Sequence, residues 1–473
     1  MKKDSKKFLI TIGTLAIVMT VVFLASFQQV QAPANGLDLA ALRNLSSSSG
    51  HPTGQQIAVS GNNVYVVWYE ETQGSFDVFL SRSIDAGVSF PLTGASNLSN
   101  TPGYSINPEI AVSGSNLYVV WEDDSLGNFD IFFTRSADTG ISFDSTINLS
   151  NTLGISAAPQ IAVSGNNVYV VWSDDTPENS GIFFTKSNNG GASFDKPVNL
   201  SASLGVSGNF GLTRIIASGD NVYLSWSEEI EGKKVATLPG SIEGDGGTIL
   251  GNEEIFLTTS NDNGATFGPV INLSNTEGRS TGQQIAVSGN NVYVVWYEED
   301  QLARIGIILR TSNDNGATFG SPVVLTNNAG TSFDPLVTAS ANNVYVIWFD
   351  SSLGNFALAL RVSNDNGASF ARAVVLTGNA GSSFDKQIMA VSGFNVFVAW
   401  DGADLSGIYL RKSNDNGASF SPAVKISEPS SITAAGSPRL AVAGNNVHAV
   451  WNEGLLVDSE IIQNRELIYK KIE

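Results

Sequence analysis

Short apolar runs and polar turns alternate along most of the chain, with a repeat of about fifty residues. In the first full repeat an apolar run at 56–59 is followed by a Ser-Gly-Asn-Asn turn and a β-branched, aromatic run at 63–68. A third apolar run at 77–81 and a short fourth piece at 97–99 complete the repeat. This pattern indicates four short antiparallel strands, called A to D here in chain order, of which A and B form a hairpin.

Tryptophan marks the end of every B strand and fixes the number of repeats. The spacings between successive tryptophans are 53, 51, 54, 70, 52, 52 and 51 residues, and the set comprises Trp68, Trp121, Trp172, Trp226, Trp296, Trp348, Trp400 and Trp451. Four short antiparallel strands at this repeat length are typical of one blade of a β-propeller. The sequence therefore predicts an all-β, eight-bladed propeller of four-stranded antiparallel blades.

The two ends of the repeat region complement each other. The last repeat supplies A, B and C strands and then the chain stops, whereas an isolated D-like triplet, Asn-Leu-Ser at 44–46, precedes the first A strand. Pairing this triplet with the last three strands would close the ring and remove its exposed sheet edges. We therefore expect a monomeric propeller at 44–473 whose last blade is closed by an N-terminal strand.

An octet of the form Ser-x-Asp-x-Gly-x-Ser/Thr-Phe lies between the C and D strands of seven repeats. A short Asp side chain accepts hydrogen bonds from nearby backbone amides, and Gly supplies a positive φ, so the octet predicts a tight turn. The position is Asp in six octets and Asn in one: Asp85, Asp138, Asn189, Asp262, Asp314, Asp365 and Asp415. These octets resemble the Asp-box, or BNR, repeats of sialidase-like β-propellers. The resemblance covers the chain from about residue 44 onward, and it implies that the octets are structural turns on the face opposite an active site.

The first residues predict export. Four lysines precede an apolar run at 8–27, and a small-residue cleavage pattern ends at Ala32. Residues 1–32 are thus expected to be a signal peptide or, alternatively, an uncleaved membrane anchor, followed by a linker at 33–43. The remaining chain is then secreted or displayed on the cell surface, and the anchor would be its only attachment to a membrane.

Composition limits the classes of partner and metal ligand that the chain can use. The formal net charge of -19 argues against nucleic acid as a partner. Cysteine is absent and only two histidines occur, so a metal would need oxygen ligands. Acidic residues follow each tryptophan, for example Glu70, Glu122 and Asp123. Closing the ring would gather them on one face, either as a Ca²⁺ or cation-binding ring or simply as soluble turns.

A second ring is expected around the central channel, made by the residue that begins each A strand. Its polar members are Gln56, Glu109, Gln160, Arg214, Gln284, Gln387 and Arg439, and Leu336 completes it. Such groups are suited to hydrogen-bonding sugar hydroxyls, although a solvated strand start needs no ligand. Arg214 and Arg439 fall in opposite blades and would hold an anion together only across a narrow channel.

Sialidase chemistry is not supported by the residues. The resemblance leads one to expect an arginine triad, a Tyr nucleophile with a Glu base, an Asp acid and an Arg-Ile/Leu-Pro motif, and no such Arg-x-Pro triplet occurs. Tyr69 and Glu70 are adjacent on a strand and so point to opposite faces. No catalytic residue is therefore carried over.

Two further features remain open. A Gly-rich insertion at 230–253 in the fourth blade is expected to be a lid, a partner contact or a loose loop. Asn-Leu-Ser triplets in the D strands match the N-glycosylation acceptor pattern. The asparagines concerned are Asn44, Asn97, Asn148, Asn199 and Asn272.

The sequence as a whole favours a non-catalytic module that binds an extracellular glycan or protein. The alternatives are a sialidase-like exo-glycoside hydrolase with a divergent site, and a structural envelope component that binds calcium.

Overall fold

The chain forms two units, Met1–Leu39 and Ala40–Glu473, and only the second contains described residues. The computed structural model describes residues 42–46, 50–91, 95–202, 210–230, 253–300, 304–326, 330–353, 356–377, 387–402, 407–427, 433–457 and 460–472. The predicted export segment at 1–32, the linker up to residue 41 and residues 231–252 of the blade-4 insertion lie outside these ranges. In the described part of the chain, no helix is both long and apolar enough to cross a membrane.

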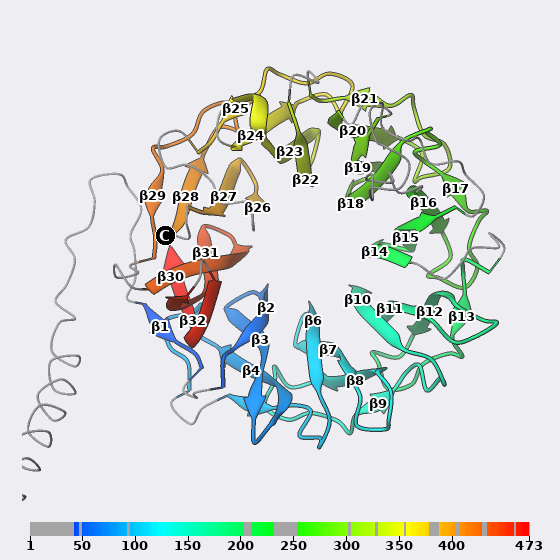
Figure 1. Ribbon diagram of the computed structural model, residues 1–473, viewed down its shortest axis with the longest axis vertical. Coiled ribbons are helices and arrows are strands. Elements are labelled where there is room, and N and C mark those ends of the chain that lie inside the picture. The colour runs from blue at the N-terminus through cyan, green and yellow to red at the C-terminus, as the bar shows by residue number, and fades with distance from the viewer. Residues whose placement is uncertain are drawn as a thin grey trace, which may run out of the picture. The chain divides into compact units, whose positions relative to one another are not determined.

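The second unit is an eight-bladed β-propeller, as predicted, with one four-stranded antiparallel sheet per blade. Figure 1 shows the A strands around the ring axis and the D strands at the outer edge. The A strands are β2 (Thr53–Ser60), β6 (Ser105–Ser113), β10 (Ser156–Ser164), β14 (Phe210–Ser218), β18 (Arg279–Ser288), β22 (Ser332–Ser340), β26 (Gln387–Ser392) and β30 (Thr433–Ala443).

The B strands pair with the A strands through tight turns. They are β3 (Asn63–Thr72), β7 (Asn116–Asp123), β11 (Asn167–Asp174), β15 (Asn221–Glu229), β19 (Asn291–Glu299), β23 (Asn343–Asp350), β27 (Asn395–Asp401) and β31 (Asn446–Val457). All eight tryptophans on these strands are among the largest fully buried side chains.

The C and D strands complete each sheet. The C strands are β4 (Ser75–Ser83), β8 (Asp130–Ser136), β12 (Gly181–Ser187), β16 (Glu253–Ser260), β20 (Ile305–Ser312), β24 (Ala357–Ser363), β28 (Ile408–Ser413) and β32 (Glu460–Ile472). The two-residue D strands are β5 (Ser96–Asn97), β9 (Ile147–Asn148), β13 (Val198–Asn199), β17 (Ile271–Asn272), β21 (Val323–Val324), β25 (Val374–Val375), β29 (Val424–Lys425) and β1 (Arg43–Asn44). A 3-10 helix, η1 (Ser351–Leu353), follows β23.

The N-terminal strand closes the last blade, which confirms the predicted ring closure. In blade 8, β1 pairs with β32, with Arg43 opposite Tyr469 and Asn44 opposite Ile468. Beyond the strand, the amide of Leu45 donates to the carbonyl of Leu467 at 2.8 Å. The two-residue β1 thus replaces the long β32 as the outer strand of this blade, so that its outer edge is as short as in the other blades.

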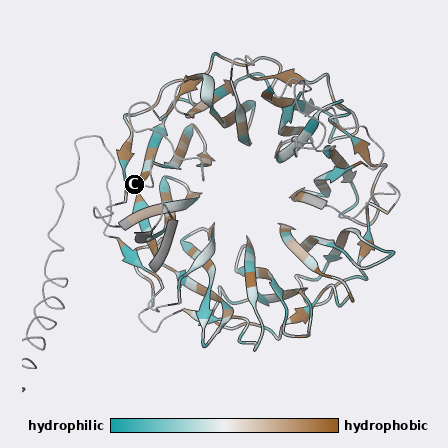
Figure 2. Cartoon of the chain, in the orientation of Figure 1, coloured by the Kyte–Doolittle hydropathy of each residue, from teal (hydrophilic) through white to brown (hydrophobic). Residues whose placement is uncertain are grey.

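The hydrophobic core lies between neighbouring blades. Trp226 and Leu224 of blade 4, for example, pack in one cluster with Tyr169, Val171 and Phe184 of blade 3. Both faces of each sheet are covered in this way, which explains why the B strands read as continuous apolar runs. Hydrophobic and hydrophilic segments alternate around the whole ring in Figure 2.

The octets form tight turns between the C and D strands and bond to the A–B turn of their own blade. In blade 6, Ser363 Oγ and Ser369 Oγ donate to the two oxygens of Asp365 at 2.7 and 2.6 Å. The amide of Asn366 donates to the carbonyl of Asn342 in the A–B turn at 2.9 Å. The octets thus share one face of the ring with the A–B turns, the octet face. The D–A and B–C connections form the opposite face, the loop face.

Candidate functional site

In seven of the eight blades the residue of the predicted channel ring does not begin the A strand, whereas β26 begins at Gln387 as expected. A β-bulge precedes the ring residue in seven blades, for example between Thr53 and Gln56 or between Ile106 and Glu109. Residues in the bulges have positive φ, such as 52° at Asn107 and 49° at Asp334. A bulge adds a residue to one strand and re-aims the next side chain. The strand therefore begins before the apolar run from which its start was inferred, for example at Thr53 rather than at Gln56.

Five of the seven predicted ring residues line one pocket of about 500 Å³ on the loop face: Gln56, Glu109, Gln160, Arg214 and Arg439. The lining comes from blades 8, 1, 2, 3 and 4. Gln284 lies outside the lining but accepts from Arg214 Nε at 3.1 Å. Gln387 also lies outside it and donates to the carbonyl of Asp334.

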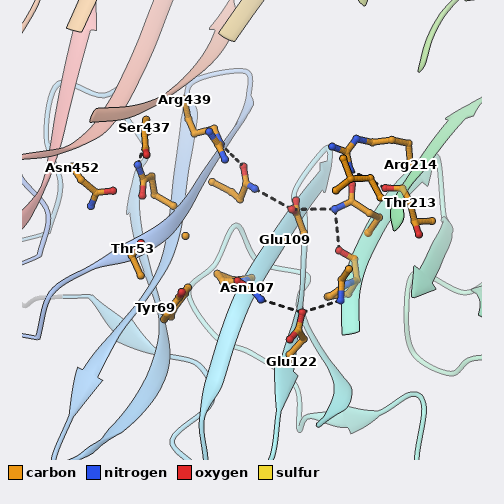
Figure 3. A pocket seen from close by; sticks show the side chains of 18 residues that line it. Thr53, Tyr69, Asn107, Glu109, Glu122, Thr213, Arg214, Ser437, Arg439 and Asn452 are labelled. Atoms are coloured by element: carbon orange, nitrogen blue, oxygen red, sulfur yellow. Dashed lines mark hydrogen bonds between the residues drawn. The ribbon is translucent and has the colours of Figure 1, made fainter. Parts of the chain in front are cut away.

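Glu109 of β6 lies at the centre of this pocket (Figure 3). Gln56 and Gln160 donate their amide nitrogens to the same carboxylate oxygen, Oε1, at 3.0 and 3.2 Å. Burial raises the pKa of the Glu109 carboxyl, although Arg439 and Arg214 oppose the rise. Among the described residues, none donates to Oε2 of Glu109.

The two arginines lie on either side of Glu109 in the view of Figure 3, and they come from blades 4 and 8, which stand opposite each other in the ring. Arg439 donates from Nε to Gln56 Oε1 at 3.1 Å and from Nη1 to the carbonyl of Pro438 at 3.2 Å. Arg214 repeats this with Gln284 and the carbonyl of Thr213. Burial lowers the pKa of both guanidinium groups, and the Glu109 charge partly restores it. Each Nη2 has no acceptor among the described residues, so two oriented cationic donors remain.

Glu122 is a pocket residue that the sequence reasoning placed among the acids after the tryptophans, as part of a cation-binding ring or of soluble turns. Its carboxylate accepts from the amide of Ala158 at 2.8 Å and from Asn107 Nδ2 at 3.1 Å. It is only 6% exposed, and burial raises its pKa. Glu122 directly follows Trp121, a position held by Tyr, Ser, Phe, Asp or Asn in the other blades. Comparing that position across repeats would have marked Glu122 and Asp401 as the two acids there.

The acids two residues after the tryptophans are internal hydrogen-bond partners rather than an exposed carboxylate ring. In six blades the indole Nε1 donates to this acid at 2.8 to 3.4 Å: Glu70, Asp123, Glu228, Glu298, Asp350 and Glu453. Asp123 also accepts from Ser105 Oγ at 2.7 Å and is fully buried. Among the described residues, no group of three or more His, Asp or Glu side chains could hold a metal ion.

The Asn-Leu-Ser triplets tie the D strands to the C strands. Asn148 Nδ2 and Ser150 Oγ donate to the carboxylate of Asp130 at 2.8 and 2.7 Å, and Asn97 Nδ2 donates to Asp77 at 2.9 Å. Elsewhere the amide of Asn275 donates to Asn272 Oδ1, Asn199 Nδ2 donates to the carbonyl of Ser180, and Ser46 bonds to Asn44 Oδ1. Glycosylation of these asparagines stays a prediction, and at Asn97 and Asn148 it would replace a hydrogen bond.

Blades 1 and 5, which stand opposite each other in the ring, share duplicate A and B strands. Their sequences are identical at every position from Thr53 to Glu71 and from Thr281 to Glu299. Each receives an arginine from the preceding blade, Arg439 or Arg214, in the same Nε-to-Gln geometry. The next blade differs: strand register places Leu336 where blade 2 has Glu109, and Phe349 where it has Glu122. The two carboxyl groups thus distinguish one side of the mouth from the other.

The fold and pocket define a β-propeller with a polar site at its channel mouth. No protein-family model and no curated protein sequence matches the chain. Among solved structures, the polysaccharide lyase Uly1 is similar at 11% identity, with 94% of each chain covered and a TM-score of 0.48. A Trypanosoma rangeli sialidase mutant matches at 10% identity over 94% of this chain and 60% of its own, with a TM-score of 0.40. A protein of unknown function from Dyadobacter fermentans matches at 13% identity over 68% of this chain and 96% of its own, with a TM-score of 0.41. These are likenesses of fold alone.

Proposed function

We propose that this chain is an exported Asp-box propeller that binds a carbohydrate, without catalysis, in the pocket at its channel mouth. The observation that carries the proposal is the set of amide, guanidinium and carboxyl groups converging from five blades on one pocket of about 500 Å³. That volume lies within the usual range for small-molecule sites.

The hydrogen bonds among the lining groups support binding. Gln56 is fixed by Arg439 on one side and by Glu109 on the other. Groups held by their neighbours lose little side-chain entropy when a ligand arrives. The Nη2 donors of the arginines and Oε2 of Glu109 then offer donors and an acceptor to sugar hydroxyls, and charged partners make the stronger hydrogen bonds.

A binding screen tests the proposal. The full chain is applied to a glycan array that includes neutral and acidic oligosaccharides, and hits are measured by calorimetry. We expect Glu109→Gln to weaken binding at least tenfold, because a hydrogen bond to a charged group is worth about 1.5–3 kcal/mol. Gln387→Ala changes the same ring outside the pocket, so it should bind like the wild type. An array without hits, or equal losses in both variants, would refute the proposal.

A glycan-cleaving enzyme is the second candidate, and one observation favours it. Glu109 and Glu122 line the same pocket, and burial raises the pKa of both carboxyls. Glycosidases use a carboxyl of raised pKa as the general acid beside a second carboxylate. The test is to incubate the glycans that bind on the array with the full chain and to measure the release of reducing ends. Release by the wild type that is lost in Glu122→Gln would establish cleavage and exclude a purely binding role.

A further inference from the structure

Three aromatic side chains lead away from the pocket on the loop face, and we call Tyr69, Phe76 and Tyr104 the aromatic rib. Tyr69 lines the pocket. Its ring centroid lies 5.7 Å from that of Phe76, edge to face, and Phe76 lies 5.6 Å from Tyr104. Tyr104 is 44% exposed. The rib therefore connects the pocket to open surface through continuous ring contacts.

The rib crosses from blade 1 to blade 2 and is held by both. Tyr69 is near the end of β3, and Phe76 is near the start of β4, after the B–C turn. Tyr104 is in the D–A connection of blade 2, where its amide donates to Asp124 Oδ1 at 2.6 Å and its carbonyl accepts from the Asp124 amide at 3.2 Å. Gly54, with a φ of 63°, lies against the Tyr69 ring, and a Cβ there would collide with it. The backbone thus fixes the rib at both ends.

The opposite side of the ring shows that folding does not require the rib. Blade 5 repeats blade 1 and places Tyr297 where Tyr69 stands. Strand register then sets Ile305 opposite Glu299, as Phe76 is opposite Glu71, and places Thr331 where blade 2 has Tyr104. The same blade therefore forms without the two outer rings. Both carboxyl groups of the pocket and the outer rings occur together on one side only.

We propose that the aromatic rib extends the pocket and binds further sugar rings of an oligosaccharide that runs outward along the boundary of blades 1 and 2. The inference rests on the proposed function. The C–H face of a sugar ring is apolar, and an aromatic ring offers it a large flat surface at low entropic cost. An exposed ring continuous with a polar pocket provides such a surface. The ligand is accordingly an oligosaccharide, with one residue in the pocket and its neighbours on the rib.

The test compares ligand length with position in the ring. Dissociation constants are measured by calorimetry for cello-oligosaccharides and oligogalacturonates, from monosaccharide to hexasaccharide, with the full chain. For wild type, affinity should rise with length. Tyr104→Ala should weaken binding of the longer members by about two- to tenfold and leave the monosaccharide unaffected, because one aromatic contact is worth about 0.5–1.5 kcal/mol. Thr331→Ala, at the equivalent place in blade 6, is the matched control and should change nothing.

The outcomes separate this inference from the proposed function. If oligosaccharides bind no better than the monosaccharide, or if Tyr104→Ala weakens all lengths alike, the rib is not a subsite, while Glu109→Gln still tests the pocket. If neither series binds, the inference fails, and the proposed function fails with it only if the glycan array also gives no hit. Because Tyr104 is exposed, its truncation should leave the unfolding midpoint unchanged, and Tyr104→Phe should retain the length dependence. A length dependence unchanged in Tyr104→Ala would overturn the inference directly.

Discussion

The glycine of the blade-4 octet is where the packing of one blade on the next can be tested most directly. Gly264 has a φ of 71°, and a Cβ added to it would lie 2.9 Å from Phe184 Cζ and 3.3 Å from Tyr169 Cε1, both in blade 3. Phe184 is locked in place by Tyr169 and by Phe267, whose rings lie 6.2 and 4.8 Å away. The ring has little room to retreat, so Gly264→Ala should strain the contact between the blades.

The same blade provides the control. Gly219, in the A–B turn, has a φ of 59°, and a Cβ there would meet nothing within 4 Å. Each substitution should cost about 1 kcal/mol for a left-handed backbone. Gly264→Ala adds overpacking of about 1–3 kcal/mol, which gives about 2–4 kcal/mol in all.

Urea unfolding followed by tryptophan fluorescence measures both variants, since all eight tryptophans are fully buried. The comparison uses the midpoint and the slope together. Combining Gly264→Ala with Phe184→Leu should recover part of the loss, because the two residues touch. Equal destabilisation by the two glycine variants would show that backbone conformation alone fixes the octet glycine and would refute the packing argument.

Three further predictions concern the interior and pH. Ser225 Oγ is buried without a hydrogen-bond partner among the described residues, at a position where the other B strands carry Val, Ile or Ala. Ser225→Val should therefore stabilise the chain by about 1–2 kcal/mol. A lower free energy of unfolding in urea would show instead that the hydroxyl is hydrogen-bonded. Burial beside Tyr469, and secondarily the charge of Lys471, lowers the pKa of His448 from 6.5 to about 4. The contribution of His448 to the free energy of unfolding should therefore be fully present above pH 6.5, and about 3 kcal/mol should be lost as the pH falls from 6.5 to 4. His448→Phe should lose that pH dependence when unfolding is measured from pH 7 to pH 4. Burial raises the pKa of Glu228 to about 7, which gives a pH dependence of opposite sign, but this effect is the same in wild type and variant and cancels when the two are compared. Hydrogen bonds from Thr318 and Ser312 lower the pKa of Asp314 to about 2, so its contribution should be present above pH 3.8 and vanish as pH falls through 2, and Asp314→Asn should reduce this acid sensitivity.

The architecture was predictable because repeats constrain it many times over. Trp at the end of each B strand, together with the octets, fixes the register of each blade, and the missing D strand of the last repeat is supplied by Asn44. A register fixed eight times tolerates an uncertain boundary in any one blade. The Phe that ends each octet also serves the packing of the blades, as Phe267 shows by lying edge to face against Phe184.

The details of the site were less accessible because they depend on local irregularity. The bulges before the ring residues have no common residue type: Gly54, Asn107, Ala158 and Ser437 all occupy the positive-φ position. Acids after the tryptophans look like soluble turns in a sequence, yet the indole of Trp226 reaches Glu228 at 2.8 Å in a fully buried setting. Such pairings depend on the direction of individual side chains, which neither the two-residue period of a strand nor the fifty-residue repeat of the blades encodes.

The duplication of blades 1 and 5 explains why the ring alone could not reveal where the site lies. Viewed as a repeat, Gln56 and Gln284 are equivalent, and so are Arg439 and Arg214. The equivalence fails in the blades that follow: blade 2 carries Glu109 where blade 6 carries Leu336. This difference defines the side of the ring on which the site lies. In a repeat protein the shared residues build the scaffold, and the positions that break the repeat are free to acquire a ligand. Replacing Leu336 by Glu should therefore place a carboxylate near the second Arg–Gln pair, Arg214 and Gln284. If the pair and the acid suffice for binding, calorimetry should detect a second glycan-binding site. An unchanged stoichiometry in a folded variant would mean that Glu122 and the aromatic rib are also required.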